Sequence, residues 1–451
     1  MTGPARRRME ATLTRIDTCN DTINAIVSLR DPDTLLADAD RADRSDLIGP
    51  LHGIPMAVKD LVATAGIRTT LGSPIFATHV PSADDAVARR LRQAGAILIG
   101  KTNTPEFGLG SHSYNPVHGV TRNPYDTRLT AGGSSGGAAA ALACGMVDLA
   151  DGSDMMGSLR NPAGWCNIYG FRPSWGLVPA DAVGDSYLHM LATDGPMARS
   201  PAGLARLLQV LAEPEPLRPF GRKPEDFTAA LAHPARRSRI GWLNDWDGAY
   251  PMEPGILDLC RDALAIFDTP VERMLAPFDA ARLWTSWTTL RAFSVAAKLE
   301  PLYADPIKRA QLKPEAIWEV ERGLALSAMD LQRASLDRSD WFRTAMTLFG
   351  QFDFLALPTA QVWPFPADWH WPKSIDGTEM NTYHRWMEVV IPVSLIGLPC
   401  IAVPAGFGPA GLPMGVQLFG PPGSDVALLQ LAQHYHERTD WTGQRPPILW
   451  G

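Results

Sequence analysis

Two long stretches without a charged residue constrain the fold of this 451-residue chain more than any other feature. Residues 129–147 carry no charge over 19 positions, and residues 389–424 carry none over 36. A membrane-spanning helix needs about 20 predominantly apolar residues in a row. The first stretch instead opens with glycine and serine, and the second is repeatedly broken by proline. We therefore expect both to be buried elements of a globular core, with no membrane contact.

The composition favours an ordered chain even though it contains 39 glycines and 39 prolines. Apolar residues make up 45% of the sequence and the net charge is only -7, so enough surface can be buried to offset the entropy of ordering. A pI near 5.8 and the lack of a long basic run argue against a nucleic-acid partner.

The five cysteines are odd in number and far apart, and none has the spacing of zinc ligands. This pattern favours a reducing compartment and no metal site. The N-terminal region has arginines but no apolar segment typical of a secretion signal. We expect a cytoplasmic protein.

Short β-prone runs alternate with helical patterns, which is typical of an α/β fold. Residues 253–348 are mostly helical in pattern, so we expect residues 211–350 to form a variable, mostly helical insertion within a single domain over residues 1–451. We predict strands at 352–358, 399–407 and 414–420, and helices at 11–29, 84–93, 138–143, 201–210 and 425–434.

Residues 95–102 match the letters of a phosphate-binding P-loop. That loop needs a flexible backbone leading into a helix, whereas Ala96-Ile97-Leu98-Ile99 has the character of a buried strand. We predict a strand here and no nucleotide site.

Residues 132–136 match the nucleophile elbow of α/β-hydrolases, G-x-S-x-G, with Ser134 as the nucleophile. That arrangement also needs a later acid and histidine, and His384, His434 and His436 are available. The residues just before the motif begin like a turn rather than like an apolar strand. This interpretation stays open beside the one that follows.

Three polar residues point to a different chemistry. Lys59 follows Met56-Ala57-Val58, a pattern that favours a buried amine with a lowered pKa. Ser134 lies in a glycine-rich loop, and Ser158 lies in a second turn of small residues. Taken singly, each also fits a structural role: a strand-end lysine, a flexible turn and a helix cap.

Together, the segments around these residues resemble the amidase signature family of Ser-Ser-Lys hydrolases. The resemblance is carried by GPLHGIPMAVKD, GKTNTPEFG, TAGGSSGGAAAALACGMVDLADGSDMMGSLRNPAGWCNIYGFRPS and GLPCIAVPAGFGPAGLPMGVQLFG. It covers most of residues 10–200 and 350–437. It implies an α/β fold in a single large domain, with a mixed central β-sheet covered by helices on both faces.

The resemblance also implies a reaction, the cleavage of amide C–N bonds in small molecules through an acyl-enzyme on Ser158. Neutral Lys59 is the expected base and Ser134 the proton relay, with no cofactor and no metal. Backbone N–H groups of residues in the turn before the nucleophile are expected to bind the oxyanion. These are Met155, Met156, Gly157 and Ser158.

Met156 departs from the family pattern, which has glycine at this position. A backbone that required φ > 0 there would be strained by a side chain. Either the turn tolerates methionine, whose side chain then forms a wall of the acyl pocket, or the chain is a catalytically impaired binding protein. Supporting roles are expected for Gly133, whose peptide bond to Ser134 is cis in this family, and for Ser153, Asp154 and Arg160.

Tryptophans in the middle of the chain favour an apolar or aryl amide as the substrate, with esters or carbamates as other acyl donors. Tyr125, Met156, Trp284 and Trp287 are the candidate pocket residues. A second interpretation is the amidase component of a tRNA amidotransferase, which needs partner subunits. Otherwise we expect a monomer or homodimer.

Overall fold

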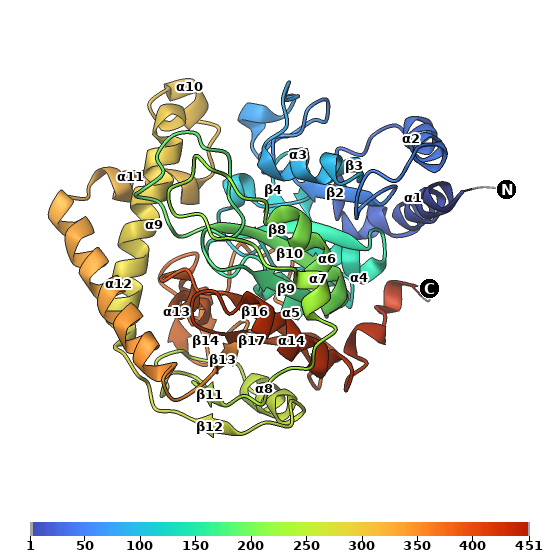
Figure 1. The fold of residues 1–451 in the computed structure, drawn as a ribbon. Helices are drawn as coiled ribbons and strands as arrows, with labels where there is room; N and C mark the ends of the chain where they lie inside the picture. The colour runs from blue at the N-terminus through green and yellow to red at the C-terminus, as the bar shows by residue number, and fades with distance from the viewer. Residues whose placement is uncertain (1–2, 450–451) are drawn as a thin grey trace.

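A mixed sheet of eight strands runs through the centre of the protein, and the computed structural model describes residues 3–449 around it (Figure 1). In spatial order the strands are β12 (Val271–Arg273), β11 (Ile240–Trp242), β13 (Phe354–Pro358), β17 (Pro413–Phe419), β16 (Cys400–Phe407), β9 (Tyr169–Arg172), β10 (Thr193–Ala198) and β8 (Leu149–Asp154). The strand β11 pairs in parallel with β12 and β13, and the other pairs are antiparallel.

A smaller sheet lies against the β8 edge. It consists of β1 (Ile26–Val27), β3 (Ile97–Thr102) and β2 (Pro55–Lys59), with β3 in the middle. The strands β2 and β8 are in contact, and the Asp151 carboxylate of β8 accepts a hydrogen bond from the backbone N–H of Lys59, the last residue of β2. The remaining strands form hairpins: β4 (Tyr114–Asn115) with β5 (Gly119–Val120), β6 (Arg122–Asn123) with β7 (Asp126–Thr130), and β14 (Ser374–Ile375) with β15 (Thr378–Glu379).

Helices flank the central sheet. They are α3 (Ala86–Gln93), α4 (Gly136–Cys144), α5 (Asn161–Trp165), α6 (Pro201–Leu211), α7 (Phe227–Ala230), α8 (Ile256–Ala265), α13 (Ile391–Ser394) and α14 (Asp425–His436). Short 3-10 helices are η1 (Pro74–Phe76), η2 (Glu106–Gly108), η3 (Arg385–Val390), η4 (Trp441–Gly443) and η5 (Pro447–Leu449).

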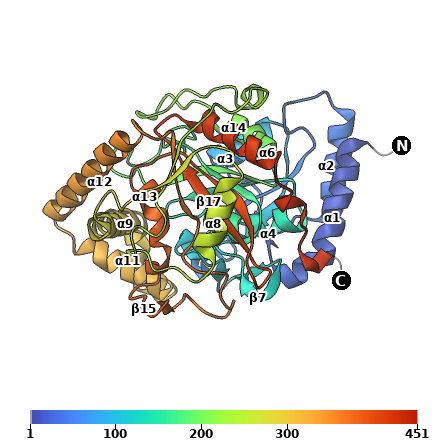
Figure 2. The ribbon, with the colours of Figure 1, turned by 90° about the horizontal axis from the view of Figure 1, so that it is seen from below.

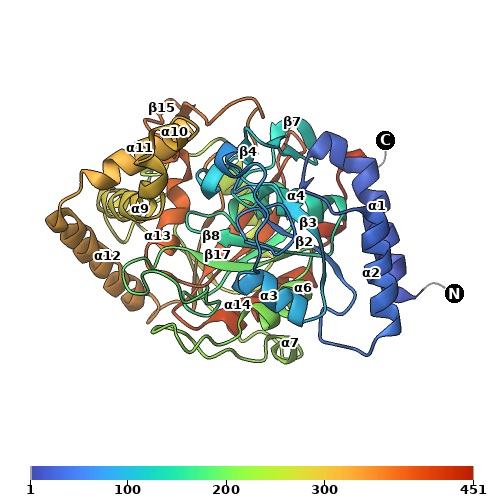
Figure 3. The ribbon, with the colours of Figure 1, turned by 90° about the horizontal axis from the view of Figure 1, so that it is seen from above.

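Two helical groups lie at opposite ends of the molecule, as three views show (Figures 1, 2 and 3). At one end are α1 (Pro4–Ile23) and α2 (Pro32–Arg44). At the other are α9 (Ala280–Tyr303), α10 (Pro306–Arg309), α11 (Pro314–Leu324) and α12 (Ala328–Leu348). The helix α9 packs against both α11 and α12.

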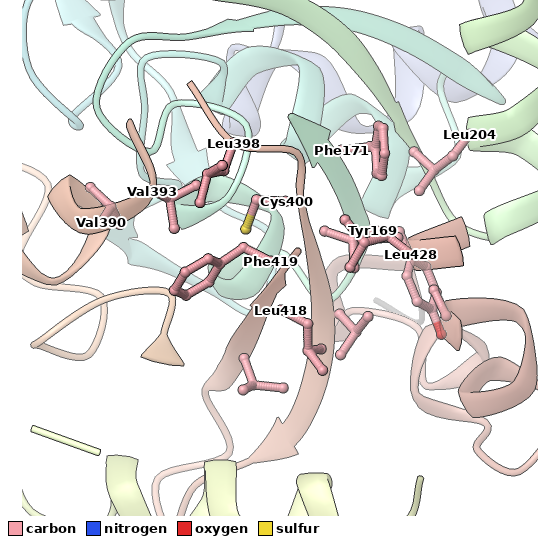
Figure 4. Packing of buried hydrophobic residues seen from close by; sticks show 14 of the residues in the cluster. Tyr169, Phe171, Leu204, Val390, Val393, Leu398, Cys400, Leu418, Phe419 and Leu428 are labelled. Atoms are coloured by element: carbon pink, nitrogen blue, oxygen red, sulfur yellow. The ribbon is translucent and has the colours of Figure 1, made fainter. Parts of the chain in front are cut away.

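Both uncharged stretches are buried core elements, as predicted. Every residue of α4 is buried, and β16 and β17 are buried along almost their whole length. Figure 4 shows Leu398, Cys400, Leu418 and Phe419 in this core. Among residues 3–449, no helix has the length and apolar character needed to cross a membrane.

The strands predicted at 352–358, 399–407 and 414–420 are confirmed as β13, β16 and β17, and α14 confirms the helix at 425–434. Residues 97–102 form the strand β3, and no helix begins at Lys101, which confirms that the P-loop letters are coincidental.

One predicted boundary was wrong. The first helix ends at Ile23 rather than at Leu29, because Asn24 adopts a left-handed conformation (φ 54°) and closes the helix. Residues 32–44 form the next helix, α2, which Asp31 caps by accepting a hydrogen bond from Thr34 N–H. Residues 211–350 contain the helices α7 to α12 and also two short strands, β11 and β12, which extend the central sheet.

Candidate active site

Lys59 is the last residue of β2, and its side chain is 1% exposed. Its Nζ lies 2.8 Å from Ser134 Oγ, 2.9 Å from Ser135 Oγ and 3.0 Å from Ser153 Oγ. As an ammonium the group donates to these hydroxyls, and as a neutral amine its lone pair can accept one of their protons.

Burial lowers the pKa of Lys59 to about 8, because an ammonium loses its hydration in the interior. Asp151, Asp194 and Asp154 oppose this shift, but in the described chain Lys59 forms no ion pair with a carboxylate. The Asp151 carboxylate instead accepts from the Lys59 backbone N–H at 3.1 Å. A lysine with this pKa can be neutral close to physiological pH.

Ser134 lies in the glycine-rich loop that leads into α4. Its peptide bond with Gly133 is cis, as predicted. Ser113 Oγ accepts from Gly136 N–H at 3.0 Å and donates to the Ser134 carbonyl at 3.4 Å, which fixes the loop on both sides of Ser134. A Cβ on Gly137 would come within 2.3 Å of Asn103 N, so the close approach at this point requires glycine.

Ser158 lies in the turn between β8 and α5, and Asp154 organises that turn. The Asp154 carboxylate accepts from Gly157 N–H at 2.9 Å and from Leu159 N–H at 3.1 Å. Arg160 donates to it through two nitrogens, each at 3.0 Å. Although burial opposes ionisation, Arg160 and Arg172 hold the pKa of Asp154 well below its usual range.

The turn tolerates methionine at position 156. Gly157 has φ 78°, whereas Met156 is not among the residues with positive φ. A Cβ on Gly157 would lie 2.9 Å from Val390 Cγ1, so glycine is required at 157 for both conformation and space. The strain considered for Met156 therefore does not arise, and Met156 gives no reason to expect an impaired homologue.

The four backbone N–H groups of the turn differ in availability. Gly157 N–H is bonded to Asp154, but in the described part of the chain the N–H groups of Met155, Met156 and Ser158 have no acceptor. These three can bind a developing oxyanion without first breaking an internal hydrogen bond.

Ser134 and Ser158 line the same cavity, of about 140 Å³. Apolar side chains form much of its wall, and Arg291 and Lys298 bring positive charge to it. The other lining residues are Leu61, Phe107, Gly108, Leu109, Ser153, Met155, Ala192, Ser294, Val295 and Leu299.

The four pocket candidates from the sequence lie outside this lining. The Met156 side chain packs in the main core, and Trp287 is fully buried there. Trp284 packs against His384 and Arg385, and Tyr125 donates to the Gln444 carbonyl at 2.8 Å. Their large apolar side chains are used for packing between elements rather than for lining the cavity.

Sequence reasoning missed four polar residues of the site: Ser135, Arg291, Ser294 and Lys298. Ser135 was detectable, because it is the second serine of the glycine-rich loop. Arg291 carries no local signal: it lies on α9, more than 130 residues after Ser158, and only the tertiary fold brings it to the cavity.

The strand before the serine loop does not fit the nucleophile elbow of α/β-hydrolases. That elbow requires a strand of the central sheet, whereas β7 forms a separate hairpin with β6.

Comparisons with known proteins show which family the chain belongs to. The family model Amidase matches residues 7–429. An acylamidase of Rhodococcus erythropolis is 31% identical over 448 residues, covering 97% of this chain and 92% of the relative. A glutamyl-tRNA(Gln) amidotransferase subunit of Chloroflexus aurantiacus is 34% identical over 476 residues, covering 98% of this chain and 94% of the relative.

A solved structure of a bacterial aryl acylamidase of the amidase signature family superimposes with a TM-score of 0.91 at 28% identity. The match covers 99% of this chain and 95% of that chain. The single-domain fold, with its large mixed sheet flanked by helices, is thus that of the amidase signature enzymes. The chain belongs to this family and is an amide-hydrolysing enzyme.

Proposed function

We propose that the chain is a serine hydrolase that cleaves amides through an acyl-enzyme on Ser158, with Ser134 and Lys59 as the proton relay. The observation that carries the proposal is the 2.8 Å contact between Lys59 Nζ and Ser134 Oγ, next to a cavity that both serines line. A serine hydroxyl is a weak nucleophile at its free pKa and needs such a base.

In the first half-reaction, neutral Lys59 takes the proton of Ser134, and Ser134 takes the proton of Ser158 as Ser158 Oγ bonds to the substrate carbonyl carbon. The N–H groups of Met155, Met156 and Ser158 stabilise the resulting oxyanion. The tetrahedral intermediate then collapses, the C–N bond breaks, and the amine leaves with the proton that returns along the relay. Water hydrolyses the acyl-enzyme through the same relay.

Asp154 and Arg160 act as positioning residues in this mechanism. Their buried hydrogen bonds hold the turn that carries both Ser158 and the oxyanion donors. Ser153 and Ser135 hold the Lys59 amine beside Ser134.

The substrates we propose are small apolar or aryl amides, with esters and carbamates as further acyl donors. The apolar part of the cavity wall supports this class. The similar acylamidase and aryl acylamidase proteins support it independently. The cytoplasmic location, the monomeric or homodimeric state, and the lack of a cofactor and of a nucleic-acid partner stay predictions.

Labelling with a fluorophosphonate, followed by peptide mass mapping, tests the nucleophile. We expect one adduct, on Ser158, and no labelling of Ser158→Ala. Ser135→Ala is a matched control that keeps Ser134 and Ser158, and it should still be labelled. An adduct on Ser134 would favour the α/β-hydrolase arrangement, and an unlabelled native protein that hydrolyses no amide would contradict the proposal.

The alternative function is that of the amidase component of a tRNA amidotransferase, which the 34% identity to a protein of that kind favours. This function predicts that glutamine is the amide substrate and that partner subunits copurify. Hydrolysis of aryl amides by the purified single chain, at a kcat/KM far above that for glutamine, would argue against it.

A further inference from the structure

Arg291 is a buried cation at the wall of the active-site cavity, and the proposed mechanism does not use it. Its side chain is on α9 and is only 3% exposed. Nε donates to Glu319 Oε1 at 2.7 Å, and Nη2 donates to the Tyr383 hydroxyl at 2.7 Å. Nη1 is directed to Met155 Sδ at 3.3 Å.

These three contacts are unequal. Glu319 and Tyr383 supply oxygen acceptors and are not among the residues that line the cavity, whereas the Met155 thioether is a weak acceptor. Met155 and Arg291 both line the cavity, so the Nη1 group of Arg291, whose acceptor is the weak one, lies at the cavity wall. A buried guanidinium N–H gains most from an oxygen acceptor, and a bound substrate can supply one.

The surroundings favour an uncharged acceptor. The Arg291 charge is already paired with Glu319, which is 1% exposed and also accepts from the Tyr383 hydroxyl at 2.7 Å. Although burial opposes the charged form, Tyr383 and Glu319 hold the pKa of Arg291 above its ordinary value. A carboxylate placed at Arg291 Nη1 would lose its hydration and face a guanidinium whose charge is already balanced, so that only Lys298, elsewhere in the lining, would attract it.

We propose that Arg291 is a specificity-determining residue that binds an uncharged oxygen of the substrate, such as a ketone, amide or nitro oxygen, through Nη1. The substrate class becomes an otherwise apolar amide with a second, neutral acceptor group. This inference rests on the proposed function, because the cavity is the substrate site only if Ser158 is the nucleophile.

The first test compares three p-nitroanilides that differ at one end of the acyl chain. The 4-oxopentanoyl, 4-methylpentanoyl and succinyl compounds have similar shapes and present a ketone, a methyl group and a carboxylate. If the acceptor belongs to the acyl side, we expect kcat/KM for the ketone to exceed both others by about 10- to 100-fold, as for a hydrogen bond to a charged group.

The same comparison applies to the leaving group. Acetanilides with a 4-acetyl, 4-isopropyl or 4-carboxyl substituent place the three groups on the amine side. An acetyl group also makes the aniline a better leaving group, so here the quantity compared is the loss of preference when Arg291 is replaced.

The variant is Arg291→Leu combined with Glu319→Leu, because replacing the arginine alone would leave a buried carboxylate without its partner. The preference for the neutral acceptor should fall by about tenfold or more in the series that shows it. Arg282→Leu is the matched control on the same helix: Arg282 is exposed and paired with Asp337 and Asp340, and its replacement should leave the preference unchanged.

Several results would overturn the inference. They are no preference in either series, a preference for the carboxylate, or a ketone preference that survives in the double variant. If the double variant does not fold, the preferences of the native enzyme in both series are compared with those of Arg291→Lys, which keeps a charge beside Glu319. A preference that Arg291→Lys leaves unchanged contradicts the inference. Fluorophosphonate labelling of Ser158 is measured in parallel: a labelled enzyme without the preference contradicts only this inference, whereas an unlabelled one contradicts the proposed function.

Discussion

Two buried lysines occupy neighbouring strands and have nearly the same electrostatics. Lys59 ends β2, and Lys101 lies in β3, where it pairs with Val58. Burial is the main cause that lowers the pKa of each amine, and both fall to about 8. A lowered pKa therefore does not distinguish a catalytic lysine from a structural one in this protein.

The difference lies in what surrounds each Nζ. Three serine hydroxyls surround Lys59, and each can give up a proton. Lys101 donates to the Val62 carbonyl, which can only accept, and to the Thr64 hydroxyl. Ser134 connects Lys59 to the cavity, whereas neither Lys101 nor its two partners are among the cavity's lining residues. Burial favours the neutral amine of both lysines. The neutral amine can act as a catalytic base only where a neighbouring group has a transferable proton and reaches the substrate cavity.

Replacing Lys59 and Lys101 one at a time should give the largest difference in effect, because only Lys59 is expected to be catalytic. Lys59→Met should lower kcat/KM by about 10³- to 10⁴-fold, because the base is lost while an unbranched apolar side chain fills the space. Initial rates on a p-nitroanilide, with a thermal melt to verify folding, measure this. Lys223→Met, at an exposed position, is the control. Activity within about tenfold of the native enzyme would mean that another group is the base.

Lys101→Met should instead alter how stability depends on pH. The folded pKa of Lys101 is about 8, below the ordinary lysine value of 10.5, so the unfolded chain holds more protons between these values. Stability of the native protein should therefore rise with pH over this window, and Lys101 should supply up to about 3 kcal/mol of that rise.

Urea unfolding of native and Lys101→Met proteins at pH 7, 8, 9 and 10 provides the measurement. Below about pH 8 the difference in unfolding free energy between the two should be constant. Above it, the difference should grow in favour of the native protein. A difference independent of pH throughout would contradict a depressed Lys101 pKa.

The pH dependence of the reaction distinguishes the same two residues. Only neutral Lys59 accepts a proton, so kcat/KM should fall about tenfold per pH unit below about pH 8 and level off above it. The acid limb of the profile should stay in place in Lys101→Met. A shift of that limb by more than about half a pH unit in this variant would show that the lysines titrate as a coupled pair.

The smallest effect is expected from the serine next to the relay. Ser135→Ala removes one of the three hydroxyls around Lys59 and should lower kcat/KM by about two- to tenfold, the worth of one neutral hydrogen bond. Ser335→Ala, at an exposed helix position, is the control. A loss of about 10³-fold would instead make Ser135 part of the relay.

Regular segments of the fold could be predicted because their patterns are local. The strands β13, β16 and β17 are buried on both faces, so each is a short run of apolar residues that can be recognised from the sequence alone. The end of the first helix was missed because a left-handed residue, Asn24, stops the helix while the apolar pattern continues into β1. The strands β11 and β12 are three residues each and are too short for a periodic signal.

The sequence by itself determined the family, the order of Lys59, Ser134 and Ser158, and the burial of both uncharged stretches, because each is encoded by neighbouring residues. Tertiary structure alone decided which hydroxyls surround Lys59, that Met156 leaves the turn unstrained, and that Arg291 reaches the cavity. These three features depend on backbone dihedral angles and on contacts between distant segments, such as the contact between Arg291 and Met155, which are more than 130 residues apart. No local pattern of residue types encodes such distances.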